Sequence, residues 1–240
     1  MKKICCTLLF CCCLPGVVIP AYTADNYKAL FDKGCKEYAG RNYAVAAETL
    51  LKALEQAPTP AAKYAVSLRL ANIYAAQKNF TAAIEQAEKV LSYEKCGKKE
   101  KISYLNLISD AYYRLGKPQE AVTAAEKALQ QKTDASLTVL QRNSLLLKAQ
   151  NLLKLHRPEE ALKALQSVKD IAKFSVQIQA KYNWLAGCAA EQSGNLKLAQ
   201  SYFSKNLSLD GKWFTRDAKR HLEKITGELK LRSLPPQPNM

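Results

Sequence analysis

A spacing of twelve residues recurs five times along this chain of 240 residues. In every copy a small residue stands twelve positions before an alanine, with a turn-forming stretch between the two. The small residues are Gly34, Ala71, Ser109, Ala149 and Gly187, and the alanines are Ala46, Ala83, Ala121, Ala161 and Ala199. Two antiparallel helices joined by a short turn can cross closely only where both carry small side chains. The spacing therefore predicts five helical hairpins.

The hairpins repeat with a period of 37 to 40 residues, counted from alanine to alanine. Periods of this size are typical of solenoids, in which each repeat packs only on its neighbours. The body of the chain is rich in Ala, Leu, Lys, Glu and Gln, which favour helix. Long alternations of Val, Ile and Thr do not occur, which argues against a mainly β fold.

A second column of apolar residues follows each alanine at a distance of two helical turns. Its members are Ala53, Val90, Ala128, Val168 and Asn206, followed directly by Leu54, Leu91, Leu129, Lys169 and Leu207. These positions return to the face that the alanine occupies, so we expect them to pack on the next repeat. Lys169 and Asn206 depart from the pattern, which predicts less regular packing in the fourth and fifth repeats.

Together these features resemble the tetratricopeptide repeat, which has a small residue in its first helix, a turn, an aromatic residue or proline, and then the alanine. Tyr43, Phe80, Pro118, Pro158 and Leu196 occupy the place after the turn. The resemblance implies an all-α, right-handed superhelical solenoid of about five helix-turn-helix repeats. They span about 26–60, 63–97, 101–135, 141–175 and 179–211, within an array over 25–211. Because the period exceeds the usual ~34 residues of the family, we expect longer helices or loops.

The residues after the array predict a terminal helix. One apolar stripe runs through Phe214, Ala218, Leu222, Ile225 and Leu229. A solenoid must cover its last open face, so residues 212–230 are predicted to be a C-terminal capping helix. The alternative is a basic helix that lies on a membrane. Residues 231–240 are predicted to form a disordered tail.

The first 24 residues have the pattern of a secretory signal peptide. Lys2 and Lys3 precede an apolar run from Ile4 to Ile19, and small residues stand before Asp25. This order of charged start, apolar middle and small-residue exit predicts export to the periplasm or beyond the cell. A membrane anchor and lipidation near Cys11 and Cys12 are the alternatives.

The rest of the sequence contains no pattern typical of catalysis. Cys35, Cys96 and Cys188 are far apart, and neither His156 nor His221 has a partner at metal-ligand spacing. Phosphate-binding loops, nucleophile elbows and the H-E-x-x-H motif do not occur. We therefore predict a protein that is not an enzyme and uses no metal or cofactor.

The net charge of +15 admits a basic surface as an alternative mode of action. Positive charge often indicates nucleic acid, but the predicted export argues against that partner. Anionic lipid, cell-wall polymer or an acidic protein surface fits an exported protein better.

Family resemblance implies that the first helices of the repeats line an inner groove that binds a peptide or a partner protein. In the chaperone-binding branch these helices clamp a carboxylate. Asn72 matches one clamp position, but Phe31, Cys35, Asn106 and Asp110 stand at the others, so that activity is not supported.

Helix geometry indicates which residues of each first helix face the groove. They are the residue directly after the small residue, the residues three or four positions further on, and the residue three positions before the small residue. The predicted groove residues are Phe31, Tyr38, Asn72, Asn106, Tyr113, Arg114, Gln150, Lys154 and Trp184. Aromatic residues with Arg and Asn among them are typical of partner-binding surfaces. The alternative is that Phe31, Leu146 and Trp184 pack between neighbouring repeats. The leading hypothesis is a scaffold or adaptor of the bacterial cell envelope.

Overall fold

The structure is a computed structural model that describes residues 22–131, 138–211 and 213–233. Residues 1–21 of the predicted signal peptide lie outside this part of the chain, as do residues 132–135 of the third predicted repeat.

Helices arranged in successive pairs make up the described residues, in which no strand occurs. The pairs are α1 (Tyr22–Ala39) with α2 (Tyr43–Glu55), α3 (Pro60–Ala76) with α4 (Phe80–Leu91), α5 (Lys98–Arg114) with α6 (Pro118–Leu129), α7 (Thr138–Lys154) with α8 (Pro158–Gln166), and α9 (Val176–Gln192) with α10 (Leu196–Leu207). A final helix, α11, spans Thr215–Ser233. The predicted all-α solenoid of five hairpins with a terminal helix is confirmed.

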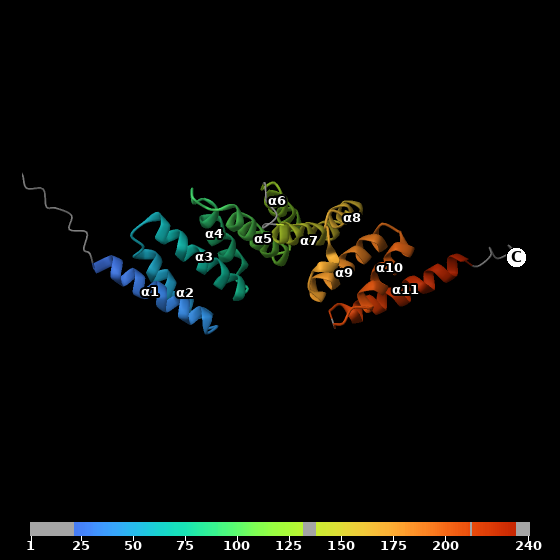
Figure 1. The fold of residues 1–240 in the computed structure, drawn as a ribbon, viewed down its shortest axis with the longest axis horizontal. Helices are drawn as coiled ribbons and strands as arrows, with labels where there is room; N and C mark the ends of the chain where they lie inside the picture. Colours follow the sequence, from blue (N-terminus) through green and yellow to red (C-terminus); the bar gives the residue numbers. More distant parts are fainter. Residues whose placement is uncertain (1–21, 132–137, 212, 234–240) are drawn as a thin grey trace, which may run out of the picture.

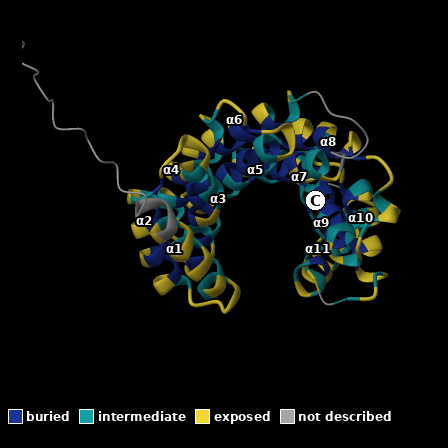
Figure 2. Ribbon diagram, turned by 60° about the vertical axis from the view of Figure 1, so that its left-hand side comes forward, coloured by how far each residue is buried: buried dark blue, intermediate teal, exposed yellow. Residues whose placement is uncertain are grey.

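The hairpins stack side by side into an open arch (Figures 1 and 2). Figure 2 places α1, α3, α5, α7 and α9 along the inner edge of the arch and α2, α4, α6, α8 and α10 along the outer edge. Each helix packs mainly on the next one in the chain. The first helices of the repeats therefore form a continuous inner face.

The helix crossings have the close packing that the twelve-residue spacing predicts. All five alanines of the repeat are fully buried. A Cβ atom added to Gly34 would lie 2.6 Å from Leu50 Cγ, and one added to Gly187 would lie 2.5 Å from Phe203 Cε1. In the third repeat Ser109 Oγ donates a hydrogen bond of 2.8 Å to the carbonyl oxygen of Ala121. The crossings are thus confirmed at both ends and in the middle of the array.

Each hairpin turn contains one residue with a left-handed backbone, five positions before the repeat's alanine. These residues are Arg41, Lys78, Gly116, His156 and Gly194, with φ between 54° and 78°. Only two of the five are glycines, so three turns adopt a conformation that costs an ordinary residue about 1 kcal/mol. The same turn geometry in every repeat brings the second helix back along the first.

The irregularity expected in the last two repeats takes two different forms. In the fourth repeat α8 has only nine residues, and a short 3-10 helix, η2 (Ile171–Lys173), follows it. In the fifth repeat α10 is regular, and Asn206 is buried because its Nδ2 donates a 2.8 Å hydrogen bond to the carbonyl oxygen of Ala180. The departure at Asn206 is therefore accommodated by a hydrogen bond between α9 and α10.

The apolar stripe of α11 faces the last repeat. Ala218 and Ile225 are fully buried and share a cluster with Ala199 and Phe203 of α10. This packing supports the capping role over the membrane alternative, because the apolar face is already covered by protein. Residues 231–233, predicted to begin the tail, form the end of α11, and residues 234–240 lie outside the described part of the chain. None of the helices described is both long and apolar enough to cross a membrane.

Candidate partner-binding pocket

A pocket of about 550 Å³ opens where α5, α7 and α9 of the inner face meet the residues that precede α11. It is lined by Tyr113, Arg114, Gln150, Leu153, Lys154, Lys181, Trp184, Leu185, Cys188, Gln192 and Phe214. Five predicted groove residues meet here, namely Tyr113, Arg114, Gln150, Lys154 and Trp184. The third, fourth and fifth repeats all contribute, so the pocket exists only in the assembled array.

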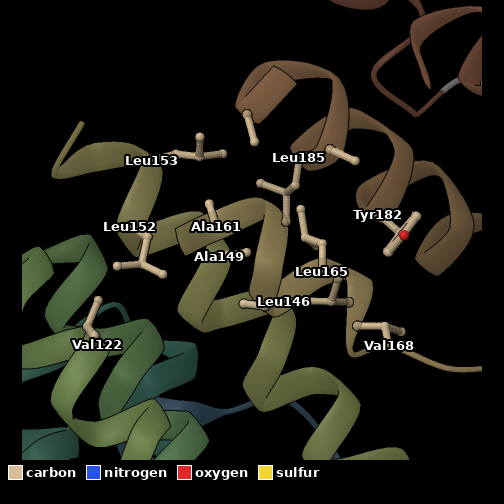
Figure 3. Packing of buried hydrophobic residues seen from close by; sticks show 13 residues of the cluster. Val122, Leu146, Ala149, Leu152, Leu153, Ala161, Leu165, Val168, Tyr182 and Leu185 are labelled. Atoms are coloured by element: carbon tan, nitrogen blue, oxygen red, sulfur yellow. The ribbon is translucent and has the colours of Figure 1, made fainter. Parts of the chain in front are cut away.

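The floor of the pocket belongs to the hydrophobic core. Leu153 of α7 and Leu185 of α9 are 8% and 5% exposed, and both belong to the core cluster of α7, α8 and α9 (Figure 3). Close packing in that cluster fixes the rotamers of both leucines. The floor is therefore rigid and apolar before any partner binds.

Aromatic rings form one wall of the pocket. The rings of Trp184 and Phe214 are stacked, with centroids 5.7 Å apart and planes 7° apart. Trp184 also contacts Phe203, at 5.6 Å between centroids, and the edge of the His221 ring. Trp184 is half-buried and packs against the core cluster of α7, α8 and α9 as well as the cluster of α10 and α11. It therefore packs between repeats and also lines the pocket.

Three cations also line the pocket, namely Arg114, Lys154 and Lys181. Lys154 Nζ lies 5.8 Å from the centroid of the Tyr113 ring, within the range of a cation–π interaction. Arg114 Nε is 3.6 Å from Asp110 Oδ2 at the rim. Burial lowers the pKa of Lys181, Asp110 opposes that shift, and Arg114 adds to it. The pocket thus combines an apolar floor with two exposed cations, Arg114 and Lys154, and one partly buried cation, Lys181.

The remaining predicted residues lie elsewhere on the inner helices. Phe31 stacks on Tyr27 at 5.9 Å, and both pack against a core cluster formed by α2 of the first repeat and α3 of the second, so the alternative of packing between repeats describes Phe31. Tyr38 is half-buried beside Tyr43. Asn72 lines a second hollow of about 360 Å³ between α3 and α5. Its Nδ2 donates to the carbonyl oxygen of Leu68 at 2.7 Å and is 3.0 Å from the Tyr104 hydroxyl.

The assignment of Asn106 to the groove surface needs correction. Asn106 is only 5% exposed. Its Nδ2 donates to the carbonyl oxygen of Leu140 at 3.1 Å, and its Oδ1 accepts from Ser144 Oγ at 2.7 Å. The side chain therefore links α5 to α7. The helical pattern placed it correctly toward the inner side, but the next repeat covers that position.

Sequence reasoning missed Lys181, Gln192 and Phe214, which also line the pocket. Lys181 stands three residues before Trp184 and hence on the same face of α9, so extending the predicted stripe by one turn would have found it. Phe214 precedes α11, outside the repeated hairpins, and its backbone is left-handed with a φ of 60°. The repeat pattern contains no signal for it.

Two of the three cysteines in the described part of the chain have raised pKa values. Burial, with Glu191 and Asp217 nearby, raises the pKa of Cys188 to about 12. Burial also raises the pKa of Cys96. Thiols with raised pKa values are poor nucleophiles at neutral pH. Within the described ranges, no group of three or more His, Cys, Asp or Glu side chains could hold a metal ion.

Comparison with known proteins agrees with the observed architecture. Residues 62–134 match a family model described as Tetratricopeptide repeat. No curated protein matches the sequence significantly.

Several solved structures share the fold. A tetratricopeptide repeat protein from Parabacteroides merdae has a TM-score of 0.69 at 17% identity, over 88% of this chain and 81% of that one. The MamA protein has a TM-score of 0.61 at 16% identity, over 90% and 100% of the two chains. PilW, a widely conserved type IV pilus biogenesis factor, has a TM-score of 0.58 at 18% identity, over 85% and 92%. At such identities the likeness extends to the fold alone.

Proposed function

We propose that the chain is a non-enzymatic scaffold of the tetratricopeptide-repeat type that holds a partner protein or peptide in the pocket between α5, α7 and α9. The family match over residues 62–134 and the shared fold support this proposal. The repeat fold supports protein–protein interaction, and the inner face presents side chains from successive repeats to one partner.

One observation carries this proposal. Tyr113, Arg114 and Trp184, which come from two different repeats, meet at one pocket whose floor is already buried and apolar. Trp, Tyr and Arg are the residues most enriched among those that dominate binding energy at protein interfaces. A rigid floor adds affinity because little side-chain freedom is lost on binding.

Removing the side chains of Tyr113 and Arg114 tests this function. Tyr113 is half-buried and Arg114 is exposed, so the double variant Tyr113→Ala with Arg114→Ala is expected to keep its melting temperature. It should lose the partners that crosslink to the wild type in the native envelope. The matched control is Lys163→Ala with Gln166→Ala, two exposed residues of α8 on the outer edge. Unchanged partners in the first variant, or a lowered melt, would remove these residues from the binding face.

The site of action that we propose is the bacterial cell envelope, after export. The leader over residues 1–24 supports export. Cleavage after Ala21 would leave α1 whole, and cleavage after Ala24 would remove only its first three residues. N-terminal sequencing of the native protein should find a start near Asp25. An intact Met1-Lys2-Lys3 sequence would contradict export with cleavage.

The net charge, +15 for the whole chain and +15 − 2 = +13 without Lys2 and Lys3 of the leader, supports a second candidate, binding to anionic lipid or cell-wall polymer through the outer surface. Binding of this kind weakens steeply with salt, because exposed charges are screened within about 8 Å at physiological ionic strength. The fraction of protein retained on anionic vesicles should then decrease as the NaCl concentration is raised from about 0.05 M to about 0.5 M. It should also be the same for the wild type and the Tyr113/Arg114 double variant.

A further inference from the structure

We propose that the pocket between α5, α7 and α9 recognises a partner segment in which an acidic residue, Asp or Glu, stands next to a large apolar residue. The inference rests on the proposed function and names the chemistry that the pocket selects.

Three cations from three successive repeats face the pocket. Arg114 comes from α5, Lys154 from α7 and Lys181 from α9. Asp110 pairs with Arg114 and also lies near enough to Lys181 to raise its pKa, but no carboxylate in the described part of the chain forms an ion pair with Lys154 or Lys181. One carboxylate does not balance three cations, so the pocket keeps a positive charge that a carboxylate of the partner would neutralise.

Of the three cations, Lys181 is the one whose charged form such a carboxylate would stabilise most. It is half-buried, and burial lowers its pKa because the charged form loses contact with water. A counter-charge placed next to a desolvated ammonium recovers part of that cost. Lys181 lines the same pocket as Arg114 and Lys154, and it thus marks the place of the acidic side chain.

An apolar side chain next to the acid fits the rest of the pocket. The stacked pair Trp184 and Phe214 offers an aromatic wall, and Leu153 and Leu185 form the floor. Aromatic contacts with such a wall contribute beyond the area that they bury. Gln150 can donate and accept hydrogen bonds, which suits the backbone of a bound segment.

The shape of the inner face favours an extended polypeptide over an isolated small anion. The second hollow includes Ser103 and Leu107 of α5, while the first includes Arg114 of the same helix. Ser103, Leu107 and Arg114 share one face of α5 by helical spacing. The first and last of them are separated by about 16 Å at 1.5 Å per residue. An extended chain of about five residues covers that length, so one segment can reach both hollows.

The two tryptophans of the chain make a direct binding assay possible. Trp213 is 44% exposed and does not line the pocket, so Trp213→Phe leaves Trp184 as a single fluorescent reporter inside it. The probe is an end-blocked peptide with an Asp-Phe pair flanked by Gly and Ser, compared with the same peptide carrying Asn for Asp. We expect a saturable change in Trp184 emission and about tenfold weaker binding of the Asn peptide, the usual effect of losing a charge-assisted hydrogen bond.

Charge-neutral variants identify the groups responsible. In the Trp213→Phe background, Lys181→Gln should weaken binding of the Asp-Phe peptide about tenfold, and Lys163→Gln on α8 should leave it unchanged. Lys154→Gln, at an exposed position, serves as the second test if Lys181→Gln lowers the melting temperature. Equal affinities for the Asp and Asn peptides, no saturable change at millimolar peptide, or tighter binding of inorganic phosphate than of peptide would overturn the inference.

Capture of native partners separates this inference from the proposed function. If Tyr113→Ala with Arg114→Ala loses the partners while Lys181→Gln and Lys154→Gln keep them, the pocket binds a partner but does not select an acid. If all of these variants keep the partners, both the inference and the proposed function are wrong. Loss of the partners in all of them supports both.

Discussion

At the scale of single residues, Gly187 and Gly227 both lie in helices but differ in the space around them. Gly187 lies at the crossing of α9 and α10, where an added Cβ would stand 2.5 Å from the Phe203 ring. Phe203 is fully buried, so a shift of its ring would disturb the side chains packed around it. Gly227 lies within α11, and an added Cβ there would meet nothing within 4 Å. The first glycine is required by packing, and the second only loosens its helix.

Alanine at these two positions is expected to change stability in opposite directions. Gly187→Ala should lower the free energy of unfolding by about 1–3 kcal/mol, the usual cost of overpacking. Gly227→Ala should raise it by about 0.5–1 kcal/mol, because alanine favours helix over glycine. Urea unfolding of both variants measures the difference. A shift of the same sign in the two variants would mean that the crossing at Gly187 is not as close as described.

The phenol of Tyr182 predicts a loss of stability at high pH. Burial, aided by Tyr202, raises the pKa of Tyr182 to about 12, while the unfolded chain titrates near 10. The folded state therefore holds this proton more tightly than the unfolded state. The resulting stability is complete below about pH 10 and is lost as the pH rises from there through about 12.

Replacing this tyrosine tests the assignment. Tyr182→Phe should show a smaller decrease in the free energy of unfolding between pH 9 and 11, an interval of about two units around the unfolded pKa. Urea unfolding at both pH values provides the measurement. A decrease as large as that of the wild type would assign the alkaline transition to other groups.

At the scale of helices, polar side chains link one repeat to the next. Asn72 and Tyr104 join α3 to α5, since Tyr104 Oη donates to the carbonyl oxygen of Leu68 at 2.9 Å. Asn106 joins α5 to Leu140 and Ser144 of α7. These hydrogen bonds fix the position of one inner helix against the next, and with it the width of the inner face.

Loss of the link at Asn106 should be costly. Asn106→Leu would leave the buried hydroxyl of Ser144 and the carbonyl oxygen of Leu140 with fewer partners, at about 1–3 kcal/mol. Asn143→Leu on α7 is the matched control, because Asn143 is exposed and should change stability by less than about 0.5 kcal/mol. Thermal unfolding compares the two. Equal small effects would show that the link contributes little.

The hairpins could be predicted from the sequence because their constraints are local. A small residue and an alanine twelve positions apart must meet in any closely packed hairpin, so the pattern repeats visibly. Asn106 shows where this reasoning ends, since its position on the helix does not reveal whether the next repeat covers it. Lys181 and Phe214 reach the pocket only after α5, α7, α9 and the start of α11 have come together. That arrangement depends on the angles between repeats, which no short motif encodes.

At the scale of the whole molecule, the described helices form an open arch whose first and last members, α1 and α11, do not pack against each other (Figure 2). A compact globule of this length has a radius of gyration of about 18 Å. Small-angle X-ray scattering of the free protein should give a clearly larger value. A radius near 18 Å would indicate that the arch closes in solution and covers its inner face.

The most direct measurement of the central claim, that the inner face holds the partner, is site-specific photo-crosslinking in the native envelope. A photoreactive phenylalanine analogue would replace Gln150 in the pocket and, in a separate variant, Ser201 on the exposed outer side of α10. We expect discrete adducts from position 150 and none of the same mass from position 201. The same adducts from both positions, or adducts from position 201 alone, would contradict the account.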